Sequence, residues 1–105
     1  MVDSSTFARI ALSLSGAVEE PHFEKRSFRI KKKIFATLHA QKNSAVLKLS
    51  LVDQSVFCSM DPKAFCPVQG SWGKQGWTMV DLNLADEGML TDAIAAAYST
   101  VLGKR

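Results

Sequence analysis

Positive charge is concentrated in one short segment of the chain. Residues 25–33 hold six cations in nine positions and no acid: Lys25, Arg26, Arg29, Lys31, Lys32 and Lys33. Clustered Lys and Arg side chains bind nucleic-acid phosphates by Coulomb attraction and counterion release when they share an accessible surface. Strand alternation predicts Arg29 and Lys31 on one face, together with Lys25 if the strand is regular that far back. Lys33, at the expected turn, and Lys48, on a later strand, would extend this patch. The alternative is a solvated edge hairpin whose lysines prevent edge-to-edge strand pairing.

Two tryptophans lie in a glycine-rich stretch, residues 70–77, with a lysine between them. An exposed indole at Trp72, beside Lys74, would stack on nucleic-acid bases, and the glycines would allow a partner to approach closely. For Trp77, at the start of a strand, we instead favour burial of the ring under a helix, as is usual for tryptophan. Trp72 stays open between the two interpretations.

Four other residues have metal-binding or nucleophilic side chains: Cys58, Cys66, His22 and His39. Their spacing matches no zinc finger or ribbon. No Ser-His-Asp or Cys-His arrangement has a supporting local motif, and the glycines of residues 70–76 lack the strand-to-helix setting of a phosphate loop. We therefore expect no catalytic residues, no metal and no cofactor. The two thiols should be reduced and mostly buried.

Helices at both ends of the chain and strands between them must position these residues. Apolar residues at helical spacing predict a first helix from a cap at residues 3–5 to about residue 14, and a last helix from Asp86 to about Leu102. Residues 18–21 are predicted as a connector ending at a proline. Alternation predicts strands at 28–31, 34–39, 45–51 and 77–84. Residues 53–60 are predicted as a short helix capped by Asp53, followed by a helical turn over 61–67.

The expected fold class is α+β, with an antiparallel sheet that carries the N- and C-terminal helices on one face and leaves the other face open. With 105 residues, 47% of them hydrophobic, the chain has the size and composition of a single domain, 1–105.

Composition narrows the cellular setting. The sequence shows neither the basic and apolar pattern of a signal peptide nor an apolar run long enough for a membrane span. We therefore expect a cytoplasmic protein with no membrane contact. We favour a monomer. The net charge is only +3, but residues 1–50 hold nine Lys and Arg against four acids, whereas residues 51–105 hold four against six. This asymmetry is compatible with a polyanionic partner.

Two motifs resemble one family. Residues 28–36, Phe-Arg-Ile-Lys-Lys-Lys-Ile-Phe-Ala, resemble the hairpin of MmcQ/YjbR-like proteins, and residues 72–82 resemble that family's W-G-x-x-G-W-x-x-v-x-L motif. Gly16, the Glu19-Glu20 pair and Tyr98 also fit. The resemblance implies a frataxin-like, "double-wing" α+β fold, and its members are commonly labelled DNA-binding. Two features depart from the family pattern: Ser71 stands where a proline often precedes the first tryptophan, and the hairpin is more basic.

The leading hypothesis is therefore a small non-enzymatic nucleic-acid-binding module, most simply a DNA-binding one, that contacts phosphates through its basic hairpin. The alternative is a protein- or small-ligand-binding domain that uses the open sheet face and the Trp72–Trp77 loop. Iron binding through an acidic ridge, which a frataxin-like fold suggests, is disfavoured. Asp3, Glu19 and Glu20 only flank the first helix and form no ridge.

Overall fold

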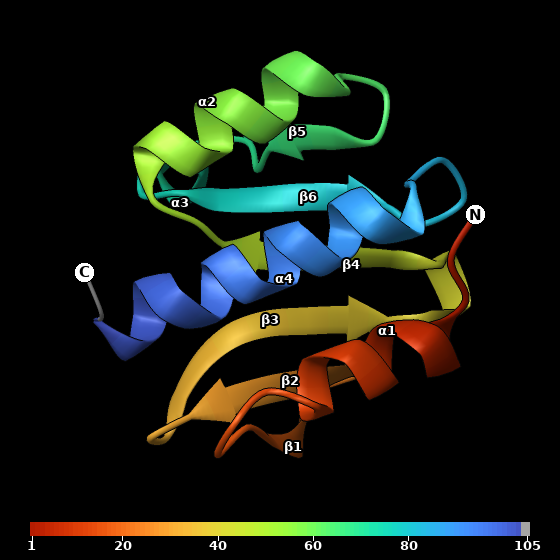
Figure 1. Cartoon of the computed structure of the whole chain (residues 1–105), viewed down its shortest axis with the longest axis vertical. Helices are drawn as coiled ribbons and strands as arrows, with labels where there is room; N and C mark the ends of the chain where they lie inside the picture. Colours follow the sequence, from red (N-terminus) through yellow and green to blue (C-terminus); the bar gives the residue numbers. More distant parts are fainter. Residues whose placement is uncertain (104–105) are drawn as a thin grey trace.

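Six strands form one antiparallel sheet in the order β1-β2-β3-β4-β6-β5 (Figure 1). The computed structural model describes residues 1–103, so the last two residues of the predicted domain lie outside the described part. In chain order the elements are α1 (Ser4–Leu12), β1 (Val18–His22), β2 (Lys25–Ile30), β3 (Lys33–His39), the 3-10 turn η1 (Ala40–Lys42), β4 (Ser44–Lys48), α2 (Leu51–Met60), β5 (Phe65–Pro67), α3 (Ser71–Lys74), β6 (Trp77–Asp81) and α4 (Glu87–Leu102).

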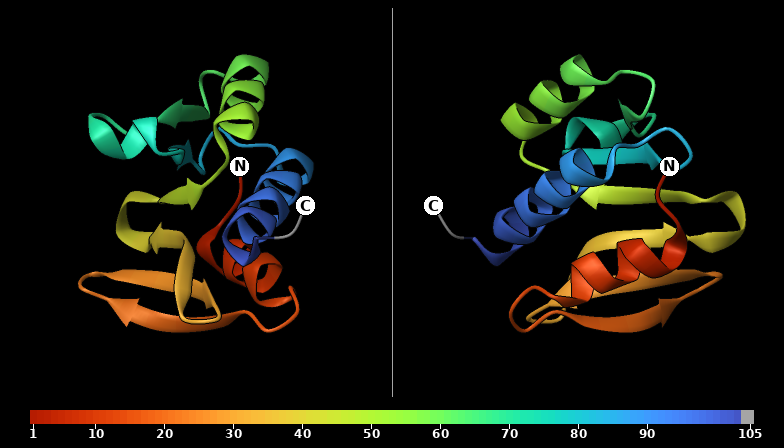
Figure 2. Two further views of the ribbon diagram at one scale, coloured as in Figure 1. Left: turned by 90° about the vertical axis from the view of Figure 1, so that its left-hand side faces the viewer. Right: turned by 45° about the vertical axis from the view of Figure 1, so that its right-hand side comes forward.

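The helices are divided unequally between the two faces of the sheet. Helices α1, α2 and α4 cover one face (Figure 1), whereas α3 and the turn between β1 and β2 project from the opposite side (left view of Figure 2). The predicted α+β fold, with both terminal helices packed on one face of an antiparallel sheet, is confirmed. The opposite face, which we call the open face, is therefore bordered by two projections.

The helix-covered face holds the hydrophobic core. Helix α1 contributes buried Phe7 and Ile10, and α4 contributes buried Leu90 and Ile94, as their helical spacing predicts. The sheet supplies buried apolar residues from each central strand: Phe28, Ala36, Leu38, Leu47 and Val80. Tyr98 packs edge-on against Phe35 with ring centroids 5.6 Å apart, and its hydroxyl donates a hydrogen bond to the Ser15 carbonyl.

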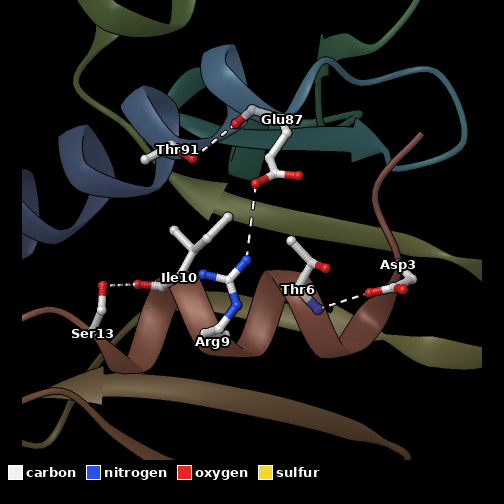
Figure 3. Close-up of polar contacts among 7 residues, drawn as sticks. All are labelled: Asp3, Thr6, Arg9, Ile10, Ser13, Glu87 and Thr91. Atoms are coloured by element: carbon white, nitrogen blue, oxygen red, sulfur yellow. Dashed lines mark hydrogen bonds and ion pairs between the residues drawn. The ribbon is translucent and has the colours of Figure 1, made fainter.

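Caps fix the starts of the two terminal helices. The Asp3 carboxylate accepts the Thr6 N–H at 2.8 Å at the start of α1, and Asp86 accepts the Met89 N–H at 3.0 Å at the start of α4. Arg9 of α1 lies 3.9 Å from the Glu87 carboxylate of α4 (Figure 3). Because both side chains are exposed, this pair adds little stability.

The sequence prediction was wrong at both edges of the sheet. Residues 18–21, expected as a connector, form β1, and part of the expected helical turn over 61–67 forms β5. Each strand has one free edge and contains a proline, which fits there because an edge position can spare its N–H. Their polar or short sequences lack the apolar alternation on which the prediction relied.

Boundaries also differ in the middle of the chain. The expected strands 45–51 and 77–84 end at Lys48 and Asp81. Leu51 begins α2, where it is 58% exposed, and the cap of α2 is Ser50 instead of Asp53. Part of the glycine-rich loop forms the short helix α3.

Candidate functional site

Residues 25–33, which carry six cations, lie in the β2–β3 hairpin, which we call the basic hairpin. The six side chains do not share one surface. Lys31 and Lys32 make its turn, with φ of 52° and 71°, the left-handed pair that a two-residue hairpin turn requires. Lys33, predicted in the turn, instead opens β3. All three lysines are exposed at the tip of the β2–β3 hairpin. They are one part of the predicted patch that is open to a partner; Lys25, at the other end of β2, is also exposed.

Arg26 is occupied by a partner that the sequence prediction missed. It lies on the helix-side face, where its guanidinium donates two hydrogen bonds to Glu19 of β1, at 2.6 and 3.0 Å. It also sits 6.0 Å from the ring of Phe28. The hydrogen bonds from Arg26 lower the pKa of Glu19, and the same pairing raises the pKa of Arg26 above its ordinary value. This cation is neutralised within the fold.

Arg29 is held on the opposite, open face. Its Nε donates to the hydroxyl of Ser27 at 3.1 Å and lies 3.8 Å from the Glu20 carboxylate. The Ser27 hydroxyl in turn donates to the Glu20 carbonyl across the β1–β2 pair. Only 22% of the Arg29 side chain is exposed. Strand β1 therefore pairs one acid with each arginine of the hairpin, one on each face of the sheet.

Lys48, at the end of β4, is also tied into the fold. Its ammonium group donates to the Gln75 carbonyl and lies 5.7 Å from the centroid of the Trp77 ring. Both contacts hold the segment that joins α3 to β6. Lys74, in contrast, is exposed at the end of α3.

Trp72 and Trp77 lie against each other on the open face. Their ring centroids are 6.3 Å apart in an edge-to-face arrangement. Trp72 is 59% exposed, as stacking on a partner requires. Trp77 is half-buried, but on the open face and not under a helix as predicted, because it pairs with Lys48 in the β4–β6 register.

A buried glutamine positions both tryptophans, and the sequence prediction did not single it out. The amide nitrogen of Gln54 in α2 approaches the Gly73 carbonyl at 3.0 Å, the Trp77 carbonyl at 3.2 Å and the Thr78 hydroxyl at 3.1 Å. Thr78 donates in turn to the Gly76 carbonyl at 3.0 Å. A buried amide with several partners fixes the local backbone tightly, since an unpaired one is costly.

Two glycines allow this segment to pack closely. A Cβ at Gly73 would stand 1.9 Å from the Val68 carbonyl oxygen, and one at Gly76 would stand 1.9 Å from the Leu49 carbonyl oxygen. The glycines of the W-G-x-x-G-W motif thus serve close backbone contacts, and the tryptophans they flank are presented to the open face.

The open face contains two adjoining hollows. The larger, about 260 Å³, is lined by His22, Lys25, Thr37, Val46, Trp72 and Trp77, with Val68. The other, about 150 Å³, shares Lys25, Thr37 and Val46 with it and adds His39, Lys42, Ser44, Ala45 and Met79. We call them the aromatic hollow and the basic hollow. Of the nine predicted contact residues, Lys25 and Trp72 line these hollows, although neither the lining as a whole nor Lys42 was predicted.

The cysteines and histidines are distributed over separate elements. Cys58 belongs to α2 and Cys66 to β5, and both are free. Cys66 is exposed, so the prediction that both thiols are mostly buried was wrong for this residue. In the part of the chain that the structure describes, no group of three or more His, Cys, Asp or Glu side chains is placed to hold a metal ion. Within residues 1–103, none of the helices combines the length and the hydropathy of a membrane span.

Comparison with known proteins identifies the family. A family model described as YjbR matches residues 12–100. The chain belongs to the YjbR family. Its fold resembles the crystal structure of Deinococcus radiodurans protein DR2400, which carries the family-model domain DUF419, with a TM-score of 0.84 and 18% identity over 99% of this chain and 81% of that one. The resemblance of the hairpin and tryptophan motifs to MmcQ/YjbR-like proteins is confirmed. No curated protein matches the sequence.

Proposed function

We propose that this YjbR-family protein is a non-enzymatic nucleic-acid-binding module whose main contact surface is the open face of the sheet. The observation that carries the proposal is that exposed Trp72 and Lys25 line the same hollow. A flat aromatic surface beside a cation is the combination that binds single-stranded nucleic acid, because bases stack on the ring while the cation attracts phosphate. Lys25 makes no ion pair with any acid among the described residues, so its charge is free for such a partner.

The basic hairpin has a secondary part in this proposal. Lys31, Lys32 and Lys33 make no ion pair among residues 1–103 and supply charge at its tip, whereas Arg26 and Arg29 are already engaged by Glu19 and Glu20. The tip lysines should therefore raise affinity for any polyanion without choosing between sequences, as phosphate contacts do.

A titration with fluorescent readout tests the proposal. At low salt, a thymidine oligonucleotide should quench the fluorescence of Trp72, and the affinity should exceed that for a duplex of the same length. Trp72→Ala should weaken binding of the single strand by about five- to a hundredfold, the worth of one base–aromatic stack. Met60→Ala, an exposed residue of α2 outside the hollows, serves as the matched control. Absence of binding by either nucleic acid at low salt would remove the proposal.

A further inference from the structure

The two hollows differ in chemistry in a way that points to one ligand. Trp72, Trp77 and Val46 give the aromatic hollow its flat apolar walls. The basic hollow carries two lysines, two hydroxyls and an imidazole: Lys25, Lys42, Thr37, Ser44 and His39. Among these groups there is no carboxylate. Such a set of donors suits a phosphate, whose oxygens only accept hydrogen bonds.

The strand register explains how these donors come together. Ser44 of β4 pairs with His39 of β3. Arg26 of β2 pairs with Leu38, so Lys25, one residue earlier on the antiparallel strand, comes opposite His39. Lys25, His39 and Ser44 therefore lie in one row across three strands on the open face. Lys42 reaches the same row from η1. Asp81 is the register partner of Ser44, but its carboxylate accepts the Asn83 N–H at 3.0 Å and does not line the hollow.

His39 supplies an independent observation. Its Nδ1 is buried and has no hydrogen-bond partner among the described residues. Buried polar atoms are nearly always paired, so this unpaired nitrogen, in a residue that lines the basic hollow, indicates a missing partner. Thr37 and Ser44 also offer hydroxyls for which the described residues show no side-chain hydrogen bond. The basic hollow is thus a set of donors without an acceptor.

We infer that the open face holds a site for one nucleotide, with the phosphate in the basic hollow and the base against Trp72 and Trp77. This deepens the proposed function, on which it rests, by naming the unit recognised. Lys25, Thr37 and Val46 line both hollows, so a ligand crossing from one to the other stays in contact with the protein. Joined, the hollows reach the lower part of the size range of small-molecule sites, about 300–1,000 Å³. The nucleotide is either free or one unit of a strand.

Three probes test the assignment: inorganic phosphate, AMP and a six-nucleotide DNA strand. Phosphate should shift the NMR signals of the His39 ring and leave tryptophan fluorescence unchanged, whereas AMP should change both. Lys42→Gln should weaken AMP binding about tenfold, the effect expected for removing one charge-assisted hydrogen bond. Ser44→Ala should act in the same direction. Lys63→Gln, an exposed lysine in the α2–β5 connection, is the matched control.

The probes separate this inference from the proposed function. If AMP binds and the strand does not, the nucleotide site stands and the nucleic-acid-binding function falls. If the strand quenches Trp72 but neither phosphate nor AMP moves the His39 signals, the function stands and the site is wrong. Equal AMP affinity in the wild type and Lys42→Gln would also overturn the site.

Discussion

Arg26 and Glu19 face each other across β2 and β1, and the guanidinium donates two hydrogen bonds to the carboxylate, at 2.6 and 3.0 Å. This ion pair neutralises the charge of one of the six cations of the basic hairpin, on the helix-side face of the sheet. It also ties the edge strand β1 to the sheet through side chains as well as through its backbone ladder. The charge count of the hairpin therefore overstates what a polyanion would meet.

Replacing Glu19 with Gln should reduce the acid sensitivity of folding. The hydrogen bonds from Arg26 lower the pKa of Glu19 below its ordinary value of 4.5, so its contribution to the free energy of unfolding is complete above that pH and is lost as the pH falls through the lower folded value. Near neutral pH, Glu19→Gln should cost less than about 1 kcal/mol, since the pair is partly exposed. Urea unfolding at a series of pH values measures both effects. A stability difference between the two proteins that did not shrink below pH 4.5 would contradict the assignment.

Neutralising the tip of the basic hairpin should change the salt dependence of nucleic-acid binding more than the fold. Lys31→Gln, Lys32→Gln and Lys33→Gln together should lower the slope of log affinity against log salt by about 0.7 for each single-strand phosphate that the protein no longer neutralises. Surface substitutions of this kind usually alter stability by no more than about 0.5 kcal/mol each. Binding titrations between low and moderate salt, with circular dichroism to check folding, give the answer. An unchanged slope in a folded triple variant would exclude the hairpin tip from the interface.

Adding one methyl group at Gly73 should destabilise the α3 segment. The new Cβ would stand 1.9 Å from the Val68 carbonyl oxygen, so the backbone must move and strain the Gln54 contacts. We expect Gly73→Ala to lower the free energy of unfolding by about 1–3 kcal/mol or more. Thermal unfolding and tryptophan fluorescence report the change. Gly88→Ala in α4, where the nearest atom is the Asp86 side-chain oxygen of the helix cap at 3.3 Å and no backbone atom stands in the way, should stay within about 1 kcal/mol of the wild type.

The two thiols should differ in reactivity. Cys66 is exposed on β5, whereas burial raises the pKa of the Cys58 thiol, with the neighbouring Cys66 as a second cause. A higher pKa leaves less of the reactive thiolate, so Cys58 should react slowly. A thiol reagent should therefore modify Cys66 rapidly in the native protein and the partly buried Cys58 more slowly, and the two rates should become equal after denaturation. Two equally fast reactions in the native protein would contradict the partial burial of Cys58, and Cys66→Ser should abolish the fast phase.

The elements predicted correctly are those with apolar periodicity. Phe7 and Ile10 in α1, and Leu90 and Ile94 in α4, occur at helical spacing, and alternation located the central strands. Strand β1 was missed because Glu19, Glu20 and Pro21 show no alternation of apolar and polar residues. The one feature of the sequence that could have indicated this strand is its pair of acids, which complement the arginines of residues 25–29 across a short turn. The terminal helices and the central strands could therefore be predicted from the sequence. The two edge strands could not, nor could the pairing of the charges, which depends on strand register.

The candidate site was predictable only in part. Trp72 and Lys25 were recognised by residue type and neighbourhood, but the hollow that joins them depends on contacts between segments far apart in the chain. Gln54 carried no signal at all, because a glutamine in a short helix is ordinarily exposed. Its burial follows from how α2 packs over Gly73 and Thr78.

The strand order has a kinetic consequence. Strand β6 lies between β4 and β5, so β5 has no neighbour to pair with until residues 77–81 arrive. The β2–β3–β4 meander, in contrast, is closed by short turns and is local in sequence. On a ribosome, the emerging chain would therefore expose the edge of β4 for as long as the following twenty-eight residues, 49–76, take to be synthesised. Closing that loop, rather than forming the meander, should limit the rate of folding.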